Sequence, residues 1–323
     1  MPEPVTIVRD VRRLNADDLG VGYAARAETS PGSSAPDAPA LQPDDPRLAN
    51  VRRLLERYGG VLLSGPSGTG KSMLAGQIAD QITQTEKSRQ AYIQFHASYQ
   101  FEDFMEGYRP RTDGTGFEQR DGVFLRMVKA AQHDGRPHVL VIDELSRADV
   151  GRVFGEALTY IERSKRGQHF LLPSGAHLYI PTNLYVIATM NPLDRGVDEV
   201  DAAFERRFAK IDMQPDRAAL EDILRVNGLD TDLVRRLLAW FSRVNSSATH
   251  NPASAVGHAY FADAVDAESL RDVWDYQLQY LVARAFQYDP DGRADVTKGW
   301  FSIFDHAPED EVIQSADGDG STV

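Results

Sequence analysis

One segment of the sequence has the residue types and the spacing that bind phosphate groups. It reads Gly65-Pro66-Ser67-Gly68-Thr69-Gly70-Lys71-Ser72. This run fits the pattern G-x-x-x-x-G-K-[ST] at every position. Glycines let a loop curl so that successive N–H groups point at phosphate oxygens, and a following helix adds its positive amino-terminal end. The segment therefore predicts a site for a nucleoside triphosphate, where Lys71 binds the β- and γ-phosphates and the Ser72 hydroxyl is a ligand of Mg²⁺.

Two adjacent carboxylates follow a second apolar run. Residues 138–142 read HVLVI, and Asp143 and Glu144 come directly after them. In phosphate-loop enzymes an Asp at the end of a neighbouring strand holds the magnesium shell, and a following Glu accepts a proton from the attacking water. We therefore assign Asp143 to the nucleotide and magnesium site and Glu144 to polarising water. Taken alone, the pair would be equally compatible with the start of a solvated loop.

A third apolar run, over residues 184–189, leads to Asn191. If this strand lies between the other two, the Asn191 amide can reach the γ-phosphate or orient the water. That placement is typical of the sensor-1 residue of AAA+ proteins. An isolated Asn after a strand is otherwise an ordinary turn residue.

Paired arginines, Arg206 and Arg207, stand at an expected helix end. An arginine fixed near a neighbouring subunit's γ-phosphate stabilises transition-state charge, and ring-forming NTPases place such fingers at this point of the chain. The ordinary alternative for either residue is a surface ion pair.

The elements expected around these residues are those of a parallel α/β sheet. A helix is predicted over 47–58, a buried strand over 61–64 and a second helix over 71–83. Strand, glycine loop and helix in this order form the βα unit of such sheets. From Arg217 onwards apolar residues recur at helical spacing. The predicted division is an N-terminal segment and flexible linker over 1–46, an AAA+ α/β domain over 47–214, a helical lid domain over 215–305 and an acidic disordered tail over 306–323.

Composition excludes several classes of function. The 323 residues include no cysteine, which removes disulfide frameworks, zinc–thiolate sites and cysteine nucleophiles. A net charge of -13 argues against duplex DNA binding by the chain as a whole, because that affinity comes from neutralising phosphates. No apolar stretch approaches the roughly 20 residues that span a bilayer. We therefore expect a cytoplasmic protein without membrane contact.

Beyond these motifs, the sequence resembles the McrB-type AAA+ proteins, the motor subunits of modification-dependent restriction systems. The likeness extends from about Val51 to Phe286. Its segments are FHASYQFEDF over 95–104, GYRP over 107–110, DELSRA over 143–148, VFGE over 153–156, MNPLDR over 190–195 and VGHAYF over 256–261.

The resemblance implies a ring, commonly a hexamer, whose hydrolysis is stimulated by a McrC-like subunit that carries a nuclease domain. It implies Mg²⁺ with either ATP or GTP as substrate, and contact with DNA indirectly through the complex. The residues before 47 are linker-like, so target recognition is expected from another chain. His258 stands where other AAA+ proteins have a sensor-2 arginine.

Two other readings share the same phosphate chemistry. One is a MoxR-like or dynein-related ATPase that remodels a protein partner. The other is a scaffold that binds the nucleotide without hydrolysing it. Glu144 argues against a scaffold, because a protein that does not hydrolyse the nucleotide has no need of a carboxylate that polarises water.

Overall fold

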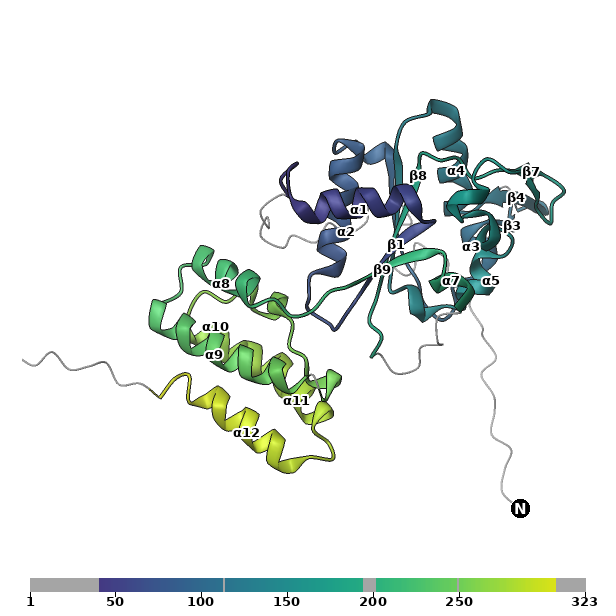
Figure 1. Ribbon diagram of the computed structural model, residues 1–323. Helices are drawn as coiled ribbons and strands as arrows, with labels where there is room; N and C mark the ends of the chain where they lie inside the picture. Colours follow the sequence, from purple (N-terminus) through teal and green to yellow (C-terminus); the bar gives the residue numbers. More distant parts are fainter. Residues whose placement is uncertain (1–40, 113, 194–201, 249, 306–323) are drawn as a thin grey trace, which may run out of the picture. The chain divides into compact units, whose positions relative to one another are not determined.

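A five-stranded parallel sheet forms the centre of the larger part of the chain (Figure 1). The computed structural model describes residues 41–112, 114–193, 202–248 and 250–305. The strands of the sheet, in spatial order, are β2 (Gln90–Gln94), β5 (His138–Asp143), β8 (Leu184–Met190), β1 (Gly60–Ser64) and β9 (Phe208–Asp212). The α/β class predicted from the sequence is confirmed.

Strand β8 lies between β5 and β1, as the interpretation of Asn191 requires. Ala188 pairs with Ile142 on one side, and Met190 pairs with Ser64 on the other. The carboxyl ends of β1, β5 and β8 therefore meet at one edge of the sheet. The two outer strands, β2 and β9, were not predicted, because their half-exposed sequences QAYIQ and FAKID lack a continuous apolar run.

Helices cover both faces of the sheet, and alternate residues of each strand point to opposite faces. Val61 and Leu63 of β1 pack with α1 (Pro46–Arg57) and α2 (Lys71–Thr83). Leu62, which lies between them, packs with α4 (Val123–Asp134) and α5 (Val150–Phe154) on the other face.

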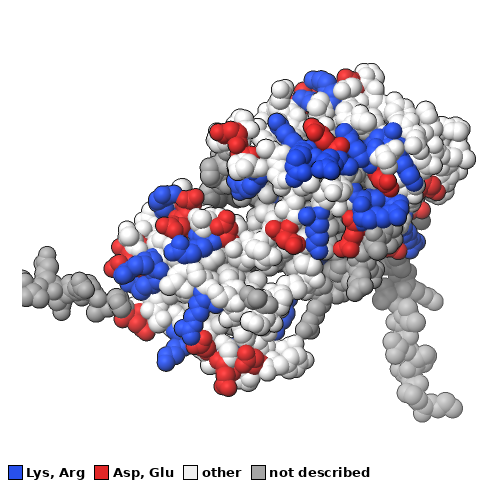
Figure 2. Space-filling model, viewed as in Figure 1, with Lys and Arg blue, Asp and Glu red and all other residues white. Residues whose placement is uncertain are grey.

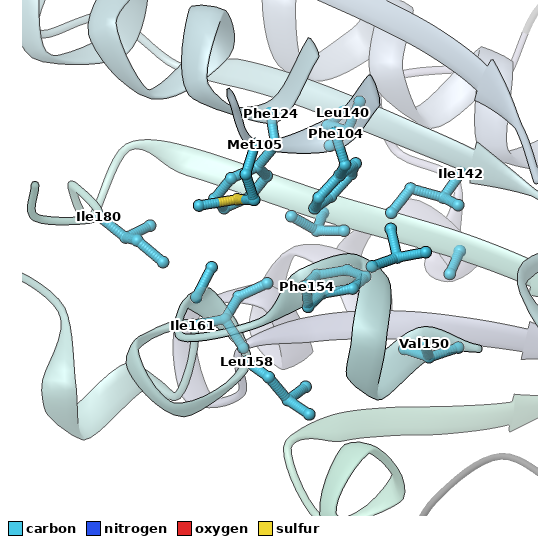
Figure 3. Packing of buried hydrophobic residues seen from close by; sticks show 14 of the residues in the cluster. Phe104, Met105, Phe124, Leu140, Ile142, Val150, Phe154, Leu158, Ile161 and Ile180 are labelled. Atoms are coloured by element: carbon cyan, nitrogen blue, oxygen red, sulfur yellow. The ribbon is translucent and has the colours of Figure 1, made fainter. Parts of the chain in front are cut away.

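A group of aromatic side chains packs on the second face. Figure 3 shows Phe104, Phe124 and Phe154 gathered beside Leu140 and Ile142 of β5. The ring centroid of Phe104 lies 5.0 Å from that of Phe124 and 4.6 Å from that of Phe154. Such pairs stabilise the core beyond the apolar area that they bury.

Two hairpins, inserted between β2 and β5 and between β5 and β8, are joined by one carboxylate. The first consists of β3 (Glu106–Pro110) and β4 (Phe117–Asp121), and the second of β6 (Phe170–Leu171) and β7 (His177–Leu178). Glu106 is buried and accepts hydrogen bonds from the Ser174 N–H at 2.9 Å, the Ser174 hydroxyl at 2.8 Å and the Gln119 amide at 2.9 Å. The turn of the second hairpin is therefore attached to the base of the first.

Short helical turns complete the part of the chain that contains the sheet. They are η1 (Lys87–Arg89), α3 (Phe101–Phe104), η2 (Leu145–Arg147), α6 (Ala157–Tyr160), η3 (Arg163–Lys165) and α7 (Ala202–Glu205).

Arginine side chains gather at the amino ends of the strands and donate to backbone carbonyls. Arg166 donates to the carbonyls of Ile161, Pro181, Leu184 and Gly59 at 2.8 to 3.1 Å. Burial lowers the pKa of Arg166 to about 9, so its guanidinium stays protonated at neutral pH.

Neighbouring arginines make the same kind of contact. Arg163 donates to the carbonyls of Glu56 and Thr182 at 3.0 and 2.7 Å. Arg89 donates to Pro137 O at 2.9 Å and forms an ion pair with Glu86.

Residues 217–301, here termed the helical region, have their own apolar core. The elements are α8 (Arg217–Val226), α9 (Thr231–Ser247), the 3-10 turns η4 (Pro252–Ser254) and η5 (His258–Phe261), α10 (Ala267–Val273), the π-turn η6 (Trp274–Leu278), α11 (Gln279–Ala285) and α12 (Pro290–Phe301). Trp240, Trp274 and Trp300 pack at its centre, with ring centroids 4.8 to 6.4 Å apart. Aspartates cap the amino ends of α8, α9, α10 and α12.

The predicted division of the chain at residue 215 remains a prediction. Most of the predicted N-terminal segment and all of the acidic tail fall outside the described residues. Leu41, within the predicted linker, is buried, and its carbonyl accepts a hydrogen bond from the Gln81 amide at 2.7 Å. In the ranges that the structure describes, no helix has the length and apolar character to cross a bilayer.

Candidate functional site

The phosphate-loop motif, Gly65 to Ser72, connects the end of β1 to the start of α2. Gly68 and Gly70 have φ of +75° and +76°, a left-handed conformation that side chains with a Cβ rarely adopt. The Thr69 hydroxyl donates to the Pro66 carbonyl at 3.0 Å and so closes the loop on itself. The sequence motif therefore forms a curled loop at the amino end of a helix.

Lys71 carries the cation of this loop. Its Nζ donates to the carbonyls of Gly65 and Pro66 at 2.9 and 2.7 Å. These contacts hold the ammonium group against the loop, where it is expected to bind phosphate groups.

A hydroxyl and a carboxylate converge beside the first turn of α2. The Ser72 hydroxyl donates to Asp143 Oδ1 at 2.7 Å, and the Thr189 hydroxyl donates to the same oxygen. Hard oxygen ligands of this kind suit Mg²⁺, which needs only one or two protein ligands besides water and phosphate oxygens. The residues present therefore fit the ion that the motif implies. Within the described ranges, no three His, Asp or Glu side chains form a metal-binding group.

Glu144 directly follows the strand and has a strained backbone. Its φ of 52° and ψ of 45° place it in the left-handed region, which is uncommon for a residue other than glycine and tends to occur at functional sites. The N–H of Glu144 donates to the Thr189 hydroxyl at 3.3 Å, and Arg147 Nε donates to the Glu144 carboxylate at 3.3 Å. The backbone of Glu144 is thus held beside Thr189, and Arg147 holds its carboxylate.

Asn191 connects the end of β8 to the phosphate loop. It is buried, its amide donates to the Ser67 hydroxyl at 3.1 Å, and its side-chain oxygen accepts from the Leu193 N–H at 3.1 Å. The side chain is therefore oriented at both ends. The Asp194 and Arg195 that complete the MNPLDR motif lie outside the described residues.

Arg206 and Arg207 occupy the turn between α7 and β9, and they differ in their surroundings. The Arg207 side chain is buried, with Nε 3.9 Å from a Glu162 carboxylate oxygen, and its carbonyl accepts from the Gly59 N–H at 2.8 Å. Arg206 is exposed. Gly59 precedes β1, so this turn lies at the opposite end of the strand from the phosphate loop. The structure brings the other predicted side chains together and does not bring these two arginines to them.

A cavity of about 290 Å³ adjoins the phosphate loop. Sequence reasoning did not find it, because its wall comes from four separate segments that share no motif. The lining residues are Arg47, Asn50, Val51, Thr69, Gly70, Met73, Leu74, Gln77, Ile211, Asp212, Met213, Gln214, Asp216, Ala219 and His258.

Thr189 is a second omission of the sequence analysis. Its hydroxyl donates to Asp143 and accepts from the Glu144 N–H, so it joins the two predicted carboxylate residues. The signal available in the sequence was a polar residue directly before the last residue of an apolar strand.

Basic side chains gather over α1 on the face drawn in Figure 2, whereas both signs of charge are interspersed over the helical region. Helix α1 contains Arg47, Arg52, Arg53 and Arg57 against a single acidic residue, Glu56. The net negative charge of the chain is therefore unevenly distributed.

The parallel sheet, the curled glycine loop and the two carboxylates at the end of β5 define a phosphate-loop nucleoside triphosphatase. Residues 60–208 match the family described as AAA domain, dynein-related subfamily. The match covers most of the parallel sheet and the phosphate loop and identifies this segment as an AAA domain.

Two curated relatives are components of restriction enzymes. The chain is 32% identical over 251 residues to the type IV methyl-directed restriction enzyme EcoKMcrB subunit of Escherichia coli K12, an alignment that covers 71% of this chain and 54% of the relative. It is 29% identical over 142 residues to the type II restriction enzyme BsuMI component YdiS of Bacillus subtilis 168, which covers 38% of this chain and 40% of that one. The chain thus spans about half the length of the curated relatives that it matches. The McrB-type resemblance is confirmed.

A solved structure described as that of an ATPase candidate from Cytophaga hutchinsonii aligns with a TM-score of 0.38 and 17% identity, over 77% of this chain and 79% of that one. A likeness at this level has no bearing on function.

Proposed function

We propose that this chain hydrolyses a purine nucleoside triphosphate as the motor subunit of a McrBC-like restriction complex. The contact between the Ser72 hydroxyl and Asp143, at 2.7 Å beside the curled loop, is the observation that supports hydrolysis most directly. It joins the end of β5 to the first turn of the phosphate-loop helix, which is what a shared magnesium shell needs.

Each residue of the site has a chemical role in this proposal. Loop N–H groups and Lys71 bind the phosphate oxygens, and Asn191 orients the attacking water. Glu144 accepts the proton of that water. Ser72 and Asp143 hold Mg²⁺, which offsets the negative charge of the phosphates when it is bound.

The cavity beside the loop is proposed to hold the nucleoside. It adjoins Thr69 and Gly70, and its wall combines apolar side chains such as Val51 and Met73 with polar ones such as Asn50 and Gln77. Sites for small ligands have this mixture, in which a few polar groups set orientation. Amides both donate and accept, so the cavity is compatible with ATP and with GTP.

Assembly into a ring, most simply a hexamer, is proposed from the position of the arginine pair. Arg207 is buried, with Nε 3.9 Å from a Glu162 carboxylate oxygen of its own subunit, whereas Arg206 is exposed and can extend towards a neighbour. We therefore assign the finger role to Arg206 and a positioning role to Arg207. Fingers supplied in trans are worth about 10³ to 10⁵ in rate at comparable sites.

The relatives suggest the partner and the final target. Both are components of restriction enzymes, so a McrC-like nuclease subunit and indirect contact with DNA are proposed here. The match to the dynein-related subfamily favours, as a second candidate, an ATPase that remodels a protein partner. Stimulation of hydrolysis by a purified nuclease subunit would distinguish the two.

Mixing two inactive variants tests the shared site. Arg206→Ala and Lys71→Ala are each expected to be nearly inactive alone. Together they should recover activity at interfaces that pair an intact loop with an intact finger, and the specific activity of the wild-type protein should rise with protein concentration.

The matched control is Arg225→Ala, which removes an exposed arginine of α8 that pairs with Asp222. This variant should behave as wild type. Specific activity that is independent of concentration, together with no recovery on mixing, would reject the shared site.

A further inference from the structure

Three exposed arginines of α1 have no acidic partner. They are Arg52, Arg53 and Arg57, here termed the α1 arginines. Arg52 donates to the Gln81 carbonyl at 3.1 Å, and Arg53 donates to the Asn50 side-chain oxygen at 2.7 Å. Among the residues that the structure describes, no carboxylate forms an ion pair with any of the three. Their positive charge is therefore not neutralised within this part of the chain.

The exposed arginines of α8 and α9 differ in this respect. A carboxylate three or four residues away forms an ion pair with each of three arginines there: Glu221 with Arg217, Asp222 with Arg225 and Asp232 with Arg235. Pairs at this spacing bring both signs of charge to the same surface. Figure 2 shows the difference, because basic side chains gather over α1 whereas both signs are interspersed over the helical region.

An acidic residue of α2 beside Arg52 binds another cation. The hydrogen bond to the Gln81 carbonyl places the Arg52 side chain at the last turn of α2. Asp80, the residue before Gln81, forms an ion pair with Lys87 at 2.6 Å and accepts from the Gln90 amide at 2.8 Å. The carboxylate on this neighbouring helix is therefore already occupied.

Two further features raise the positive potential at α1. Arg53 and Arg57 are four residues apart, a spacing at which like charges on a helix repel each other. Arg163 Nε donates to the Glu56 carbonyl at 3.0 Å, which places a fourth guanidinium at the carboxyl end of the helix. Glu56 is the single acidic residue of α1. A polyanion that binds this face would relieve the repulsion.

We propose that the α1 arginines bind the phosphate backbone of duplex DNA. The choice of DNA rests on the restriction function proposed above, whereas the cationic surface is independent of it. Guanidinium groups form charge-assisted hydrogen bonds with phosphate oxygens. Contacts of this kind fix a protein on a duplex without reading its bases. The contact with DNA is then direct, in addition to any contact through another chain of the complex.

The chemistry of α1 suits a duplex rather than a single strand. Single strands are bound by aromatic side chains on which unpaired bases stack. The helix, PRLANVRRLLER, contains no aromatic residue between its arginines. The net charge of the chain is -13, so the remaining surface repels DNA. Binding therefore depends on this face and weakens as salt is added.

The triple variant Arg52→Gln, Arg53→Gln, Arg57→Gln tests the proposal. We expect the full chain with these changes to bind a short mixed-sequence duplex roughly tenfold to a hundredfold more weakly than the wild type, measured by fluorescence anisotropy at about 50 mM salt. The slope of log affinity against log salt should become shallower by up to about 2.7, because each lost phosphate contact removes about 0.9. An unchanged affinity and slope would overturn the inference.

A second triple variant, Arg217→Gln, Arg225→Gln, Arg235→Gln, is the matched control. It removes the same charge from exposed arginines that have acidic partners. This variant should bind the duplex as the wild type does. Equal losses in the two triple variants would show that only the net charge matters, and the assignment to α1 would be wrong.

Hydrolysis separates this inference from the proposed function. None of the α1 arginines belongs to the proposed nucleotide site, so their variant should hydrolyse the nucleotide at the wild-type rate without DNA. A lower rate, or a steeper dependence of the rate on protein concentration, would assign them to subunit assembly instead. Loss of binding to polyglutamate with unchanged binding to DNA would assign them to an acidic protein partner. In both cases the inference fails while hydrolysis stands, whereas DNA binding that depends on α1 in a chain without hydrolysis would show the reverse.

Discussion

The two ends of the central sheet are both rich in polar groups, but those groups have different partners. At the carboxyl ends of the strands, Ser72, Asp143 and Thr189 bind one another through side-chain atoms. At the amino ends, Arg163 and Arg166 bind backbone carbonyls. Side chains that hold one another can exchange those contacts for a ligand, whereas side chains that satisfy buried carbonyls cannot leave without cost. The proposed chemistry therefore belongs to the carboxyl ends of the strands, and the contacts at the amino ends contribute to stability.

The largest expected effect is that of Lys71→Ala. The phosphates lose the lysine cation of the loop, so triphosphate binding should fall below detection while the fold survives. Titration of the folded variant measures this, and Lys298→Ala, an exposed lysine of α12, is the matched control. Unchanged affinity would show that the phosphate loop does not bind the nucleotide.

Glu144→Gln should separate binding from turnover. The amide keeps the shape and leaves Asp143 in place but accepts no proton, so hydrolysis should drop by about 10²-fold or more at unchanged affinity. Single-turnover assays measure the chemical step, with Glu221→Gln on the exposed side of α8 as control. Turnover near wild type would place the base elsewhere.

Thr189→Val should have a smaller effect on the same end of the sheet. The substitution removes the donor to Asp143 and the acceptor of the Glu144 N–H, and loss of such supporting contacts lowers activity by roughly tenfold. Thr189→Ser keeps the hydroxyl and should restore the rate. If both variants are equally slow, the strand has been disturbed rather than the hydrogen bonds.

Arg166→Met tests the amino end and should leave turnover per folded molecule unchanged. Four carbonyls lose their donor, so the free energy of unfolding should fall by roughly 3 kcal/mol. Denaturant titration measures the loss, and Arg53→Met, at an exposed site on α1, should cost almost nothing. A large change in the rate of the folded variant would contradict the division between the two ends.

The sequence was sufficient to predict the candidate site residues at the carboxyl ends of the strands, because they stand in local motifs. The run from Gly65 to Ser72 and the position of Asp143 after an apolar strand each depend on a few consecutive residues, and these were placed correctly with respect to the strands. The role of Asn191 was predicted on the condition that β8 lies between β5 and β1, and the structure meets that condition. Buried parallel strands have continuous apolar runs, which is why these three strands could be predicted from the sequence.

Features built from distant residues could not be predicted in the same way. The cavity draws on α1, the phosphate loop, the end of β9 and the helical region, and no spacing relates Arg47 to His258. Arg206 is exposed and Arg207 is buried, a difference that depends on packing against residues remote in sequence such as Gly59 and Glu162. Edge strand β9 was missed because charged residues interrupt its apolar ones and the strand is only partly buried.

The buried carboxylate of Glu106 holds the two hairpins together. Its three hydrogen bonds join the Ser174 turn to β3 and, through Gln119, to β4. Tyr108 and Phe117, which project from the first hairpin, are 71% and 70% exposed. A partner that binds either aromatic ring therefore contacts a hairpin that a single buried carboxylate attaches to the second hairpin.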